Sequence, residues 1–393
     1  MASKVCPYCF EKIETRQIHF RCINVNPQAC THEPDARLAQ YRRLLITDPM
    51  PRVFAVTRRR WLRAPTRATC PSCGDPSTKT ICPHCHNELP TYFFHTRNYT
   101  LALIGAKDSG KSHYVAVLIQ QLKNRVGRNF NAALNAMDDQ TERRYRNDFF
   151  RYIQKGERIP NTVSARAHLE VRYPLVYRFT LQERLWGLFR RTRSMNLVFF
   201  DTAGEDLDQI DLMATETRYI ANSDGLIFLL DPLQLPAVRD RLPDGAGLPT
   251  INTEPHEIIG RVIRLIRSYR ELRPEAKIRT PVALAFSKID EVRDLFEPGS
   301  PIHRHSAHTG AFDRAEAAQT SESMRAHLEE WGCASLDLLV HNDFKRFAYF
   351  GLSALGARPD ARGRLSKGVV PFRVEDPLLW LLYSLGLIAG KKE

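Results

Sequence analysis

The segment Leu101–Ser112 constrains the fold more than any other part of the chain. Four apolar residues lead into Gly105-Ala106-Lys107-Asp108-Ser109-Gly110-Lys111-Ser112. The two glycines permit a tight turn whose backbone N–H groups point inward, toward a polyphosphate. Lys111 adds a positive charge for the terminal phosphates, and the Ser112 hydroxyl suits Mg²⁺. We call Gly105–Ser112 the phosphate loop.

The residues after the phosphate loop are amphipathic and predict a helix over residues 111–125. Val115, Leu118 and Leu122 recur at helical spacing. Such a helix places the positive end of its dipole beneath a bound anion. Because a strand precedes the loop and a helix follows it, we predict that Gly105–His113 binds the phosphates of a nucleotide.

A second apolar run, Met195–Phe200, ends in Asp201-Thr202-Ala203-Gly204. At the carboxyl end of a buried strand, Asp201 would hold Mg²⁺ through water, and the bare N–H of Gly204 would meet a γ-phosphate. These residues predict a nucleoside triphosphate site but do not decide its base.

A third apolar run, Pro281–Phe286, precedes Ser287-Lys288-Ile289-Asp290, and this motif bears on the base. The Lys288 stem would pack along the purine plane. The Asp290 carboxylate would accept from both guanine donors, N1–H and the exocyclic amine. Adenine would leave that carboxylate buried and unpaired, which is costly. The motif therefore favours guanine.

A fourth predicted strand, over residues 346–352, leads into Ser353-Ala354-Leu355. In this chain order the four motifs, each after an apolar run, resemble those of the translation-factor-related (TRAFAC) class of P-loop GTPases. The resemblance covers the chain from about Tyr99 to its C-terminus. It implies GTP or GDP with Mg²⁺ as the ligand, and a backbone contact from Ser353-Ala354-Leu355 to the guanine oxygen.

The resemblance also implies individual roles. It assigns the terminal phosphates to Lys111 and Gly204, Mg²⁺ to Ser112 and Asp201, and guanine to Ser287, Lys288 and Asp290. Ser287 stands where Asn or Thr is usual in the family, so the hydroxyl of Thr is kept with a shorter reach.

The residues for hydrolysis are less clearly marked. Glu205 follows Gly204 where Ras-like members have the Gln that orients water, so hydrolysis would be slow or organised differently. No clean motif marks the threonine of the first switch segment; Thr162 is our choice, and Ser164 competes with it. The predicted catalytic set is Lys111, Thr162, Gly204 and Glu205. A nucleotide-bound scaffold that does not hydrolyse GTP stays open as an alternative.

Eight of the nine cysteines lie within the first 85 residues. Cys70-x₂-Cys73-x₈-Cys82-x₂-Cys85 has the spacing of a zinc ribbon, because each CPxC turn presents two thiolates and two turns complete a tetrahedron. Cys6 and Cys9 form another such turn. We predict that Cys22 and Cys30 complete a second, separate site with them.

Both predicted sites are closed, so their zinc would be structural. Two alternatives stay open: His19 or His32 could replace a cysteine, and the Cys6–Cys9 turn could pair with a later turn. A disulfide framework is disfavoured, because Met1–Phe10 does not resemble a secretion signal and nucleotide-dependent enzymes work inside reducing cells. We therefore predict a cytoplasmic location.

The chain is basic, with a formal net charge of +13. Residues 1–97 hold 15 Lys and Arg against 7 Asp and Glu, and the run Arg58-Arg59-Arg60-Trp61-Leu62-Arg63 separates the cysteine clusters. Such a run could dock an acidic partner protein, face solvent or bind nucleic acid, and charge alone does not choose. A second cluster, of Arg184, Arg190, Arg191 and Arg193, could supply a charge to a phosphoryl group in cis.

Two other segments have plainer interpretations. Pro298–His308 holds three histidines without a metal-binding pattern around them, so we predict a flexible insertion loop. Leu378–Ile388 is apolar, but its length of eleven residues cannot span a bilayer. We predict no membrane span, and a last helix that packs on the sheet.

These patterns predict an α/β fold in two parts. Residues 1–92 would form a zinc-binding module and residues 96–393 a P-loop GTPase domain. Strands and helices alternate in the second part, which predicts a mainly parallel sheet with helices on both faces and the nucleotide at the carboxyl ends of the strands. The predicted strands are 99–104, 168–180, 195–201, 225–231, 281–287 and 346–352. The predicted helices are 111–125, 138–154, 206–221, 255–272, 312–332 and 375–388.

The chain has predicted zinc-binding CPxC turns before the GTPase motifs and the sequence DPLLWLL near its C-terminus. In these features it resembles the bacterial double-GTPase group of TRAFAC domains. This resemblance implies a GTP-binding switch of a bacterial regulatory or defence system. GTP and Mg²⁺ would order the segments around Thr162 and Gly204, and a protein partner docked on the zinc module would read the difference. The alternatives are the non-hydrolysing scaffold and a nucleic-acid-binding module that uses Arg58–Arg63.

Overall fold

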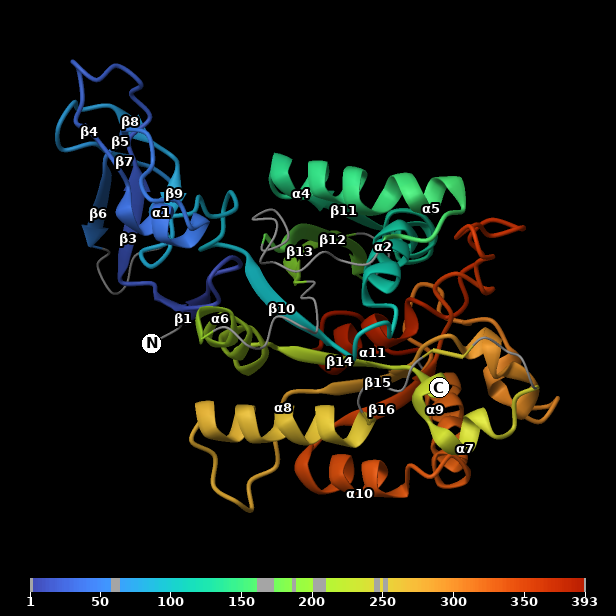
Figure 1. Ribbon diagram of the computed structural model, residues 1–393. Helices are drawn as coiled ribbons and strands as arrows, with labels where there is room; N and C mark the ends of the chain where they lie inside the picture. Colours follow the sequence, from blue (N-terminus) through green and yellow to red (C-terminus); the bar gives the residue numbers. More distant parts are fainter. Residues whose placement is uncertain are drawn as a thin grey trace.

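A computed structural model describes residues 3–57, 64–160, 173–185, 189–200, 210–243, 248–249 and 254–391. In these ranges a seven-stranded sheet forms the centre of the molecule, in the order β11-β12-β13-β10-β14-β15-β16 (Figure 1). The strands are β10 Arg97–Ile104, β11 Ala132–Ala136, β12 Leu175–Leu185, β13 Phe189–Phe199, β14 Gly225–Leu230, β15 Val282–Phe286 and β16 Phe347–Gly351. Pairing is parallel from β13 through β10 to β16 and antiparallel from β11 to β13, so the sheet is mixed.

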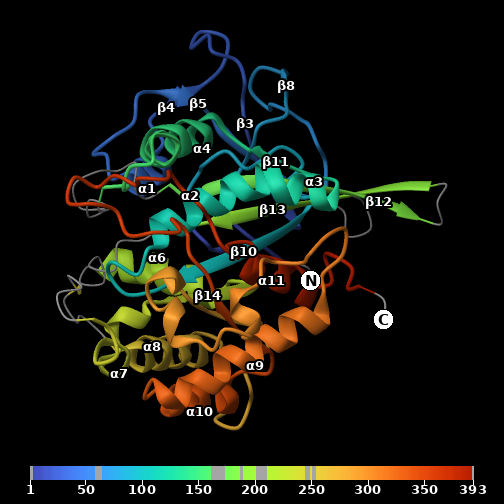
Figure 2. The same cartoon turned by 90° about the vertical axis from the view of Figure 1, so that its right-hand side faces the viewer.

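Strands β12 and β13 form a long antiparallel ribbon. They pair from Leu175 opposite Phe199 to Leu185 opposite Phe189, and Figure 2 shows the ribbon extending beyond the body of the molecule. The prediction followed only the apolar residues and missed the charged continuation of both strands, because backbone pairing does not require apolar side chains. It also missed β11, whose Ala132 pairs with Leu181. Residues 168–172, where the strand was predicted to begin, lie outside the described ranges.

Helices cover both faces of the sheet, as predicted. One face carries α6 Ile210–Ala221, α8 Pro255–Tyr269, α9 Arg314–Glu330 and α10 Ala334–Asp343; the other carries α2 Lys111–Gln121, α4 Asp139–Arg144, α5 Arg151–Lys155 and α11 Asp376–Ser384. Shorter helices are α1 Ala36–Arg42, α3 Gly127–Phe130 and α7 Pro236–Arg239. Side chains of β14 alternate between the faces: Leu226 and Phe228 join one buried cluster, Ile227 and Leu229 the other. Helix α10 was not predicted.

The insertion after α2 contains the predicted extra helix. A π-helical turn over Tyr145–Phe150 joins α4 to α5, so helical structure is continuous from Asp139 to Lys155. The Asp138 carboxylate caps its first turn by accepting from the Thr141 N–H at 2.6 Å. The helix ends where Gly156 turns left-handed, at a φ of 66°.

The cysteine-rich segment is built from short strands. They are β1 Ser3–Val5, β2 Lys12–Glu14, β3 Gln17–Arg21, β4 His32–Glu33, β5 Met50–Pro51, β6 Val53–Thr57, β7 Ala68–Thr69, β8 Pro76–Ser77 and β9 Thr80–Ile81. Strand β3 lies between β6 and β9, and its Ile18 and Phe20 form a small core with Phe54. Cys6–Phe10, by contrast, belongs to the large cluster beneath the main sheet. The domain boundary at residue 92 stays a prediction.

None of the helices in the described residues combines the length and the apolar character that crossing a bilayer requires.

Candidate functional site

The phosphate loop connects β10 to α2, as the sequence predicts. Gly110 precedes the first turn of α2 with a φ of 89°, and Asp108 is also left-handed, with a φ of 61°. A Cβ atom on Gly105 would lie 2.6 Å from the backbone oxygen of Leu229. Only glycine lets the loop pass so close to β14, so the backbone geometry explains both glycines.

Lys111 lies across the phosphate loop. Its Nζ donates to the backbone oxygens of Gly105 at 2.9 Å and Ala106 at 2.8 Å. Ser112 follows in the first turn of α2. An ammonium group beside a glycine-rich turn at a helix N-terminus favours an anionic ligand.

The guanine-type motif after β15 is hydrogen-bonded to the phosphate loop. The Ser287 hydroxyl lies 2.9 Å from the backbone oxygen of Ser109 and 3.1 Å from that of Leu230. The backbone N–H of Ile289 donates to the Leu352 oxygen at 3.1 Å, which ties the motif to β16. The motif thus contacts both neighbouring strand ends, through the side chain of Ser287 and the backbone of Ile289.

Asp231, at the end of β14, is a candidate site residue that the sequence analysis missed. Its buried carboxylate lies 2.5 Å from the Lys288 Nζ and accepts the Leu233 N–H at 3.0 Å. The ion pair fixes the course of the Lys288 side chain, whose stem is predicted to line the purine. Its position in the sequence could have indicated it, because Asp231 directly follows a strand that is buried throughout. The carboxyl ends of such strands form the edge where ligands bind in parallel sheets.

The Ser353-Ala354-Leu355 segment lies at the same edge, after β16. The Ser353 hydroxyl accepts the Gly356 N–H at 2.8 Å. A Cβ on Gly356 would lie 2.1 Å from the Val370 oxygen, and its φ is 84°, so this turn also requires glycine. The structure therefore places the three described motifs at the carboxyl ends of parallel strands β10, β15 and β16.

Part of the insertion packs against the phosphate loop. The Ile159 N–H donates to His113 Nε2 at 3.0 Å, and Arg158 Nη2 lies 3.9 Å from Asp108 Oδ1. Burial, followed by the charges of Arg158 and Lys288, lowers the pKa of His113 to about 4. His113 is therefore neutral near pH 7 and serves as a hydrogen-bond acceptor.

Several predicted residues lie outside the described ranges. They are Thr162, Ser164, Asp201, Gly204, Glu205 and the run Arg58–Arg63. Of the two predicted magnesium ligands, Ser112 is in the first turn of α2 and Asp201 is among the residues just named. Their roles stay predictions.

The arginine cluster of β12 and β13 lies at the opposite end of the sheet. Strand β13 pairs in parallel with β10, with Phe199 opposite Leu101. Residues 189–194 therefore extend beyond the amino end of β10, whereas the phosphate loop follows its carboxyl end. Arg193 instead donates to the Gly386 oxygen at 3.4 Å. The strand register therefore gives no support to the possibility that one of Arg184, Arg190, Arg191 and Arg193 stabilises a phosphoryl group.

The eight amino-terminal cysteines form two groups of four. The first tetrad is Cys6, Cys9, Cys82 and Cys85; the second tetrad is Cys22, Cys30, Cys70 and Cys73. Neighbouring Sγ atoms are 3.8–3.9 Å apart in the first tetrad and 3.5–3.8 Å apart in the second. Tetrahedral zinc with Zn–S bonds of about 2.3 Å requires Sγ separations of about 3.8 Å. All eight are free thiols, and both tetrads fit zinc.

The predicted partition of the cysteines is wrong. The Cys70–Cys73 and Cys82–Cys85 turns belong to different tetrads. Strand β9 runs antiparallel to β3, with Ile81 opposite His19. Cys82 therefore lies toward the start of β3, beside the Cys6–Cys9 turn, and the end of β3 brings Cys22 to the Cys70–Cys73 turn. Spacing alone could not distinguish the two pairings.

Nearby N–H groups stabilise thiolates in both tetrads. The Asn87 side-chain amide donates to Cys85 Sγ at 3.2 Å, and the His84 backbone N–H to Cys82 Sγ at 3.4 Å. Burial acts to raise the pKa of Cys70, but backbone hydrogen bonds from Cys73 and Ser72 lower it to about 7. Such donors are typical of structural metal sites.

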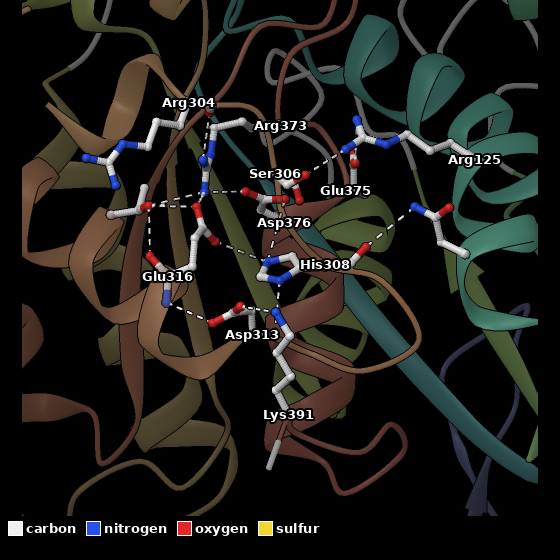
Figure 3. Close-up of polar contacts among 12 residues, drawn as sticks. Arg125, Arg304, Ser306, His308, Asp313, Glu316, Arg373, Glu375, Asp376 and Lys391 are labelled. Carbon is white, nitrogen blue, oxygen red and sulfur yellow. Dashed lines mark hydrogen bonds and ion pairs between the residues drawn. The ribbon is translucent and has the colours of Figure 1, made fainter. Parts of the chain in front are cut away.

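A third polar cluster joins α9 to α11 (Figure 3). His308 Nε2 lies 3.7 Å from Glu316 Oε2 and 3.8 Å from Asp376 Oδ1. Its Nδ1 accepts the Asp313 N–H at 3.1 Å, so the ring proton is on Nε2 and that nitrogen has no lone pair for a metal. Arg373 bridges the two carboxylates, with Nη2 2.8 Å from Asp376 Oδ2. The cluster is therefore a buried charge network.

The segment Pro298–His308, predicted as a flexible insertion loop, packs part of its length into the interior. Ile302 is 2% exposed and His308 is 3% exposed. Sequence pattern could not predict this packing, because the partners of His308, Glu316 and Asp376, lie on α9 and α11.

Comparison with known proteins gives one sequence relative and remote structural matches. No protein-family model matches the chain. The candidate ESX-1 scaffolding and assembly protein SaeC of Mycolicibacterium smegmatis is 27% identical over 328 residues, which cover 78% of this chain and 80% of that protein. The GTP-bound S. cerevisiae Ski7 GTPase-like domain matches with a TM-score of 0.30 and 12% identity, over 76% of this chain and 51% of that chain. Bacterial elongation factor EF-Sec, which is selenocysteine-specific, matches with a TM-score of 0.25 and 12% identity, over 73% of this chain and 29% of that chain.

Proposed function

We propose that this protein binds GTP and GDP at the carboxyl edge of its sheet and acts as a hydrolysing switch. The observation that carries the proposal is the 2.9 Å contact between the Ser287 hydroxyl and the Ser109 oxygen. It holds the guanine-type motif against the phosphate loop, so one nucleotide can contact both. Lys111 would bind the terminal phosphates, and Asp290 would accept from the guanine N1–H and amino group.

The bound nucleotide would carry Mg²⁺, held by Ser112 and Asp201. The ion would neutralise charge on the β- and γ-phosphates. Lys288, fixed by its 2.5 Å ion pair with Asp231, would line the purine. Two structural zinc ions would occupy the cysteine tetrads.

The zinc-bearing segment would dock a protein partner. The relative SaeC is named as a scaffolding and assembly protein, which supports a role in building a multiprotein system. A bacterial regulatory or defence setting and a cytoplasmic location are part of this proposal, on the strength of the sequence resemblance. Nucleotide state would then control partner binding.

The base preference has a sharp test in Asp290→Asn. An asparagine amide offers N–H donors where the carboxylate accepts, so it suits the carbonyl that xanthine has in place of the guanine amino group. We expect GTP affinity to fall about 100-fold and xanthosine triphosphate binding to appear, as measured by competition with a fluorescent nucleotide. Asp294→Asn, at an exposed position four residues on, is the matched control. Unchanged GTP preference in Asp290→Asn would overturn the assignment of the base.

Hydrolysis is tested by phosphate release over several turnovers. We expect release by the wild type and none by Lys111→Ala. The scaffold alternative has its own support in the name of SaeC. Tight GTP binding by the wild type without any phosphate release would favour the scaffold over the switch.

A further inference from the structure

Arg158 reaches the phosphate loop from the insertion. After α5, Gly156 turns left-handed with a φ of 66°, and its oxygen accepts the Leu365 N–H at 2.8 Å. The Arg158 N–H then donates to the Gly363 oxygen at 2.7 Å. These backbone contacts hold residues 156–158 between α5 and the loop that follows β16 (Figure 1).

The side chain of Arg158 points at the phosphate loop. Its Nη2 lies 3.9 Å from Oδ1 of Asp108, the fourth residue of the loop. The next residue, Ile159, is 4% exposed and is hydrogen-bonded to His113, directly after Ser112. The backbone around Arg158 is thus fixed on both sides, while the side chain is about half exposed, at 51%.

The charge of Arg158 acts on the start of α2. It is the second cause, after burial, that lowers the pKa of His113. Other cations lie nearby: Lys107 is within the phosphate loop, and the ammonium groups of Lys111 and Lys288 contact the Gly105 oxygen and Asp231. Arg158 differs from these lysines because a guanidinium can bridge two oxygens at once.

We propose that Arg158 is a catalytic residue for GTP hydrolysis, supplied in cis by the insertion; this inference rests on the proposed function. In the reaction a water oxygen bonds to the γ-phosphorus while the bond from phosphorus to the β–γ bridging oxygen breaks. GDP leaves with that electron pair, and the water proton passes to a phosphate oxygen, which gives GDP and inorganic phosphate. Arg158 donates to the oxygens on which charge accumulates.

The proposal explains two features of the chain. Glu205 replaces the glutamine that orients water in Ras-like members, and its carboxylate adds no positive charge for the γ-phosphate, a charge that Arg158 can provide. Asp108 is an unusual neighbour for a polyphosphate, because its carboxylate would repel the phosphate charge. A guanidinium at 3.9 Å offsets that repulsion before and during binding.

The test uses the full-length zinc-loaded protein with GTP and Mg²⁺, in single-turnover hydrolysis. We expect Arg158→Ala to slow hydrolysis at least 100-fold while GTP affinity changes less than about threefold. Arg158→Lys should remain slow, because an ammonium cannot bridge two oxygens. Added guanidinium ion should partly restore the rate of Arg158→Ala, which a structural role would not allow. Arg193→Ala, at the opposite end of the sheet, is the control and should hydrolyse at the wild-type rate.

The outcomes separate this inference from the function on which it rests. No GTP uptake by the wild type would overturn the proposed function. If Arg158→Ala binds GTP and hydrolyses it at the wild-type rate, the role of Arg158 is overturned. The same holds if the wild type binds GTP but does not hydrolyse it. Both outcomes leave nucleotide binding intact. Equal loss of affinity and rate in Arg158→Ala, without rescue by guanidinium, would also reject it.

Discussion

The two cysteine tetrads share their ligand chemistry and differ in what surrounds them. In the first tetrad every cysteine is at most 7% exposed, and all four belong to the buried cluster that includes α6 and α8. The second tetrad belongs to a small separate cluster with Ile18, Phe20 and Phe54. Figure 1 shows β4, β5, β7 and β8 apart from the main sheet. The first tetrad is thus part of the main core, and the second belongs to a smaller cluster, which we call the satellite.

Contacts around the first tetrad reach the predicted switch region. The Phe10 ring lies 5.3 Å from that of Phe200 and 4.8 Å from that of Tyr219, measured between centroids. Phe200 directly precedes Asp201, and Tyr219 belongs to α6. The Asn222 side chain also donates to the Phe10 oxygen at 3.0 Å. A change at the first tetrad should therefore affect the nucleotide site, and a change at the second should not.

The largest expected effect comes from removing one ligand of each tetrad. Structural zinc contributes about 10–16 kcal/mol of apparent binding free energy. We expect Cys82→Ser to lose one zinc, to unfold the protein at a much lower temperature and to weaken GTP binding. Cys70→Ser should also lose one zinc, yet keep GTP affinity and the main unfolding transition. Zinc analysis, calorimetry and nucleotide titration on the same samples make the comparison.

Equal damage to GTP binding by Cys82→Ser and Cys70→Ser would contradict the division into core and satellite. A conservative control is Cys333→Ser, which alters a buried thiol outside both tetrads. It should retain both zinc ions.

The next effect compares two fully buried phenylalanines. Phe10 and Phe20 are both 0% exposed, the first against α6 and the second stacked on Phe54 with centroids 6.0 Å apart. Truncation of a buried phenylalanine costs about 3–5 kcal/mol. We expect Phe10→Ala to lower the global free energy of unfolding by that amount, and Phe20→Ala to destabilise only the satellite. Hydrogen exchange resolves the two, because it reports each region separately; faster exchange in β10 and α6 of Phe20→Ala would disprove the separation.

The sequence was most informative where local pattern decides structure. The phosphate loop, the guanine-type motif and the helix at 138–154 each depend on neighbouring residues, and the structure has them at the predicted positions. The eight clustered cysteines could be singled out for the same reason, because each CPxC turn is local. Their pairing was missed, because it depends on β9 lying against β3.

Other misses have the same cause. Asp231 and Arg158 approach the site from separate strands and insertions, and only the fold brings them to Lys288 and Asp108. The arginines of β12 and β13 looked suitable by charge, but the parallel register of β13 with β10 carries them to the far end of the sheet. Composition does not encode such placement.

Two separate aspartates, one in the main domain and one in the cysteine-rich segment, should affect the pH dependence of stability with opposite signs. Burial, opposed by the Thr100 N–H and Arg270, raises the pKa of Asp224 to about 6. Because the folded protein binds this proton more tightly than the unfolded chain does, protonated Asp224 contributes stability that is fully present below about pH 4. That contribution is lost as the pH rises through 6. Asp224→Asn should therefore stabilise the protein by about 2 kcal/mol at pH 7.5 and by about half as much at pH 5. Urea unfolding at the two pH values measures the difference; a constant effect would refute the burial argument.

Asp35, in the cysteine-rich segment, provides the opposite case. Burial acts to raise the pKa of Asp35, but Arg21, the Leu38 N–H and His86 lower it. Its stabilising contribution is present above the unfolded value near 4 and is lost as the pH falls further. Asp35→Asn should destabilise the segment at pH 7.5, because Arg21 would stay buried without its charge partner. The rate of limited proteolysis within the cysteine-rich segment, measured at neutral pH for the wild type and Asp35→Asn, tests this prediction.

The smallest expected effect concerns the link between α6 and the first tetrad. Arg218 Nε donates to the Cys9 oxygen at 3.2 Å and lies 3.4 Å from Glu11 Oε1. Because the pair is partly exposed, Arg218→Ala should cost only about 1 kcal/mol. The informative readout is hydrogen exchange in α6, which should accelerate in Arg218→Ala and not in Arg241→Ala, which removes an exposed ion pair with Glu330. Identical exchange rates in the two variants would mean that the first tetrad is buried against α6 without restraining the motion of that helix. The remaining contact expected to couple the first tetrad to α6 would then be the packing of Phe10.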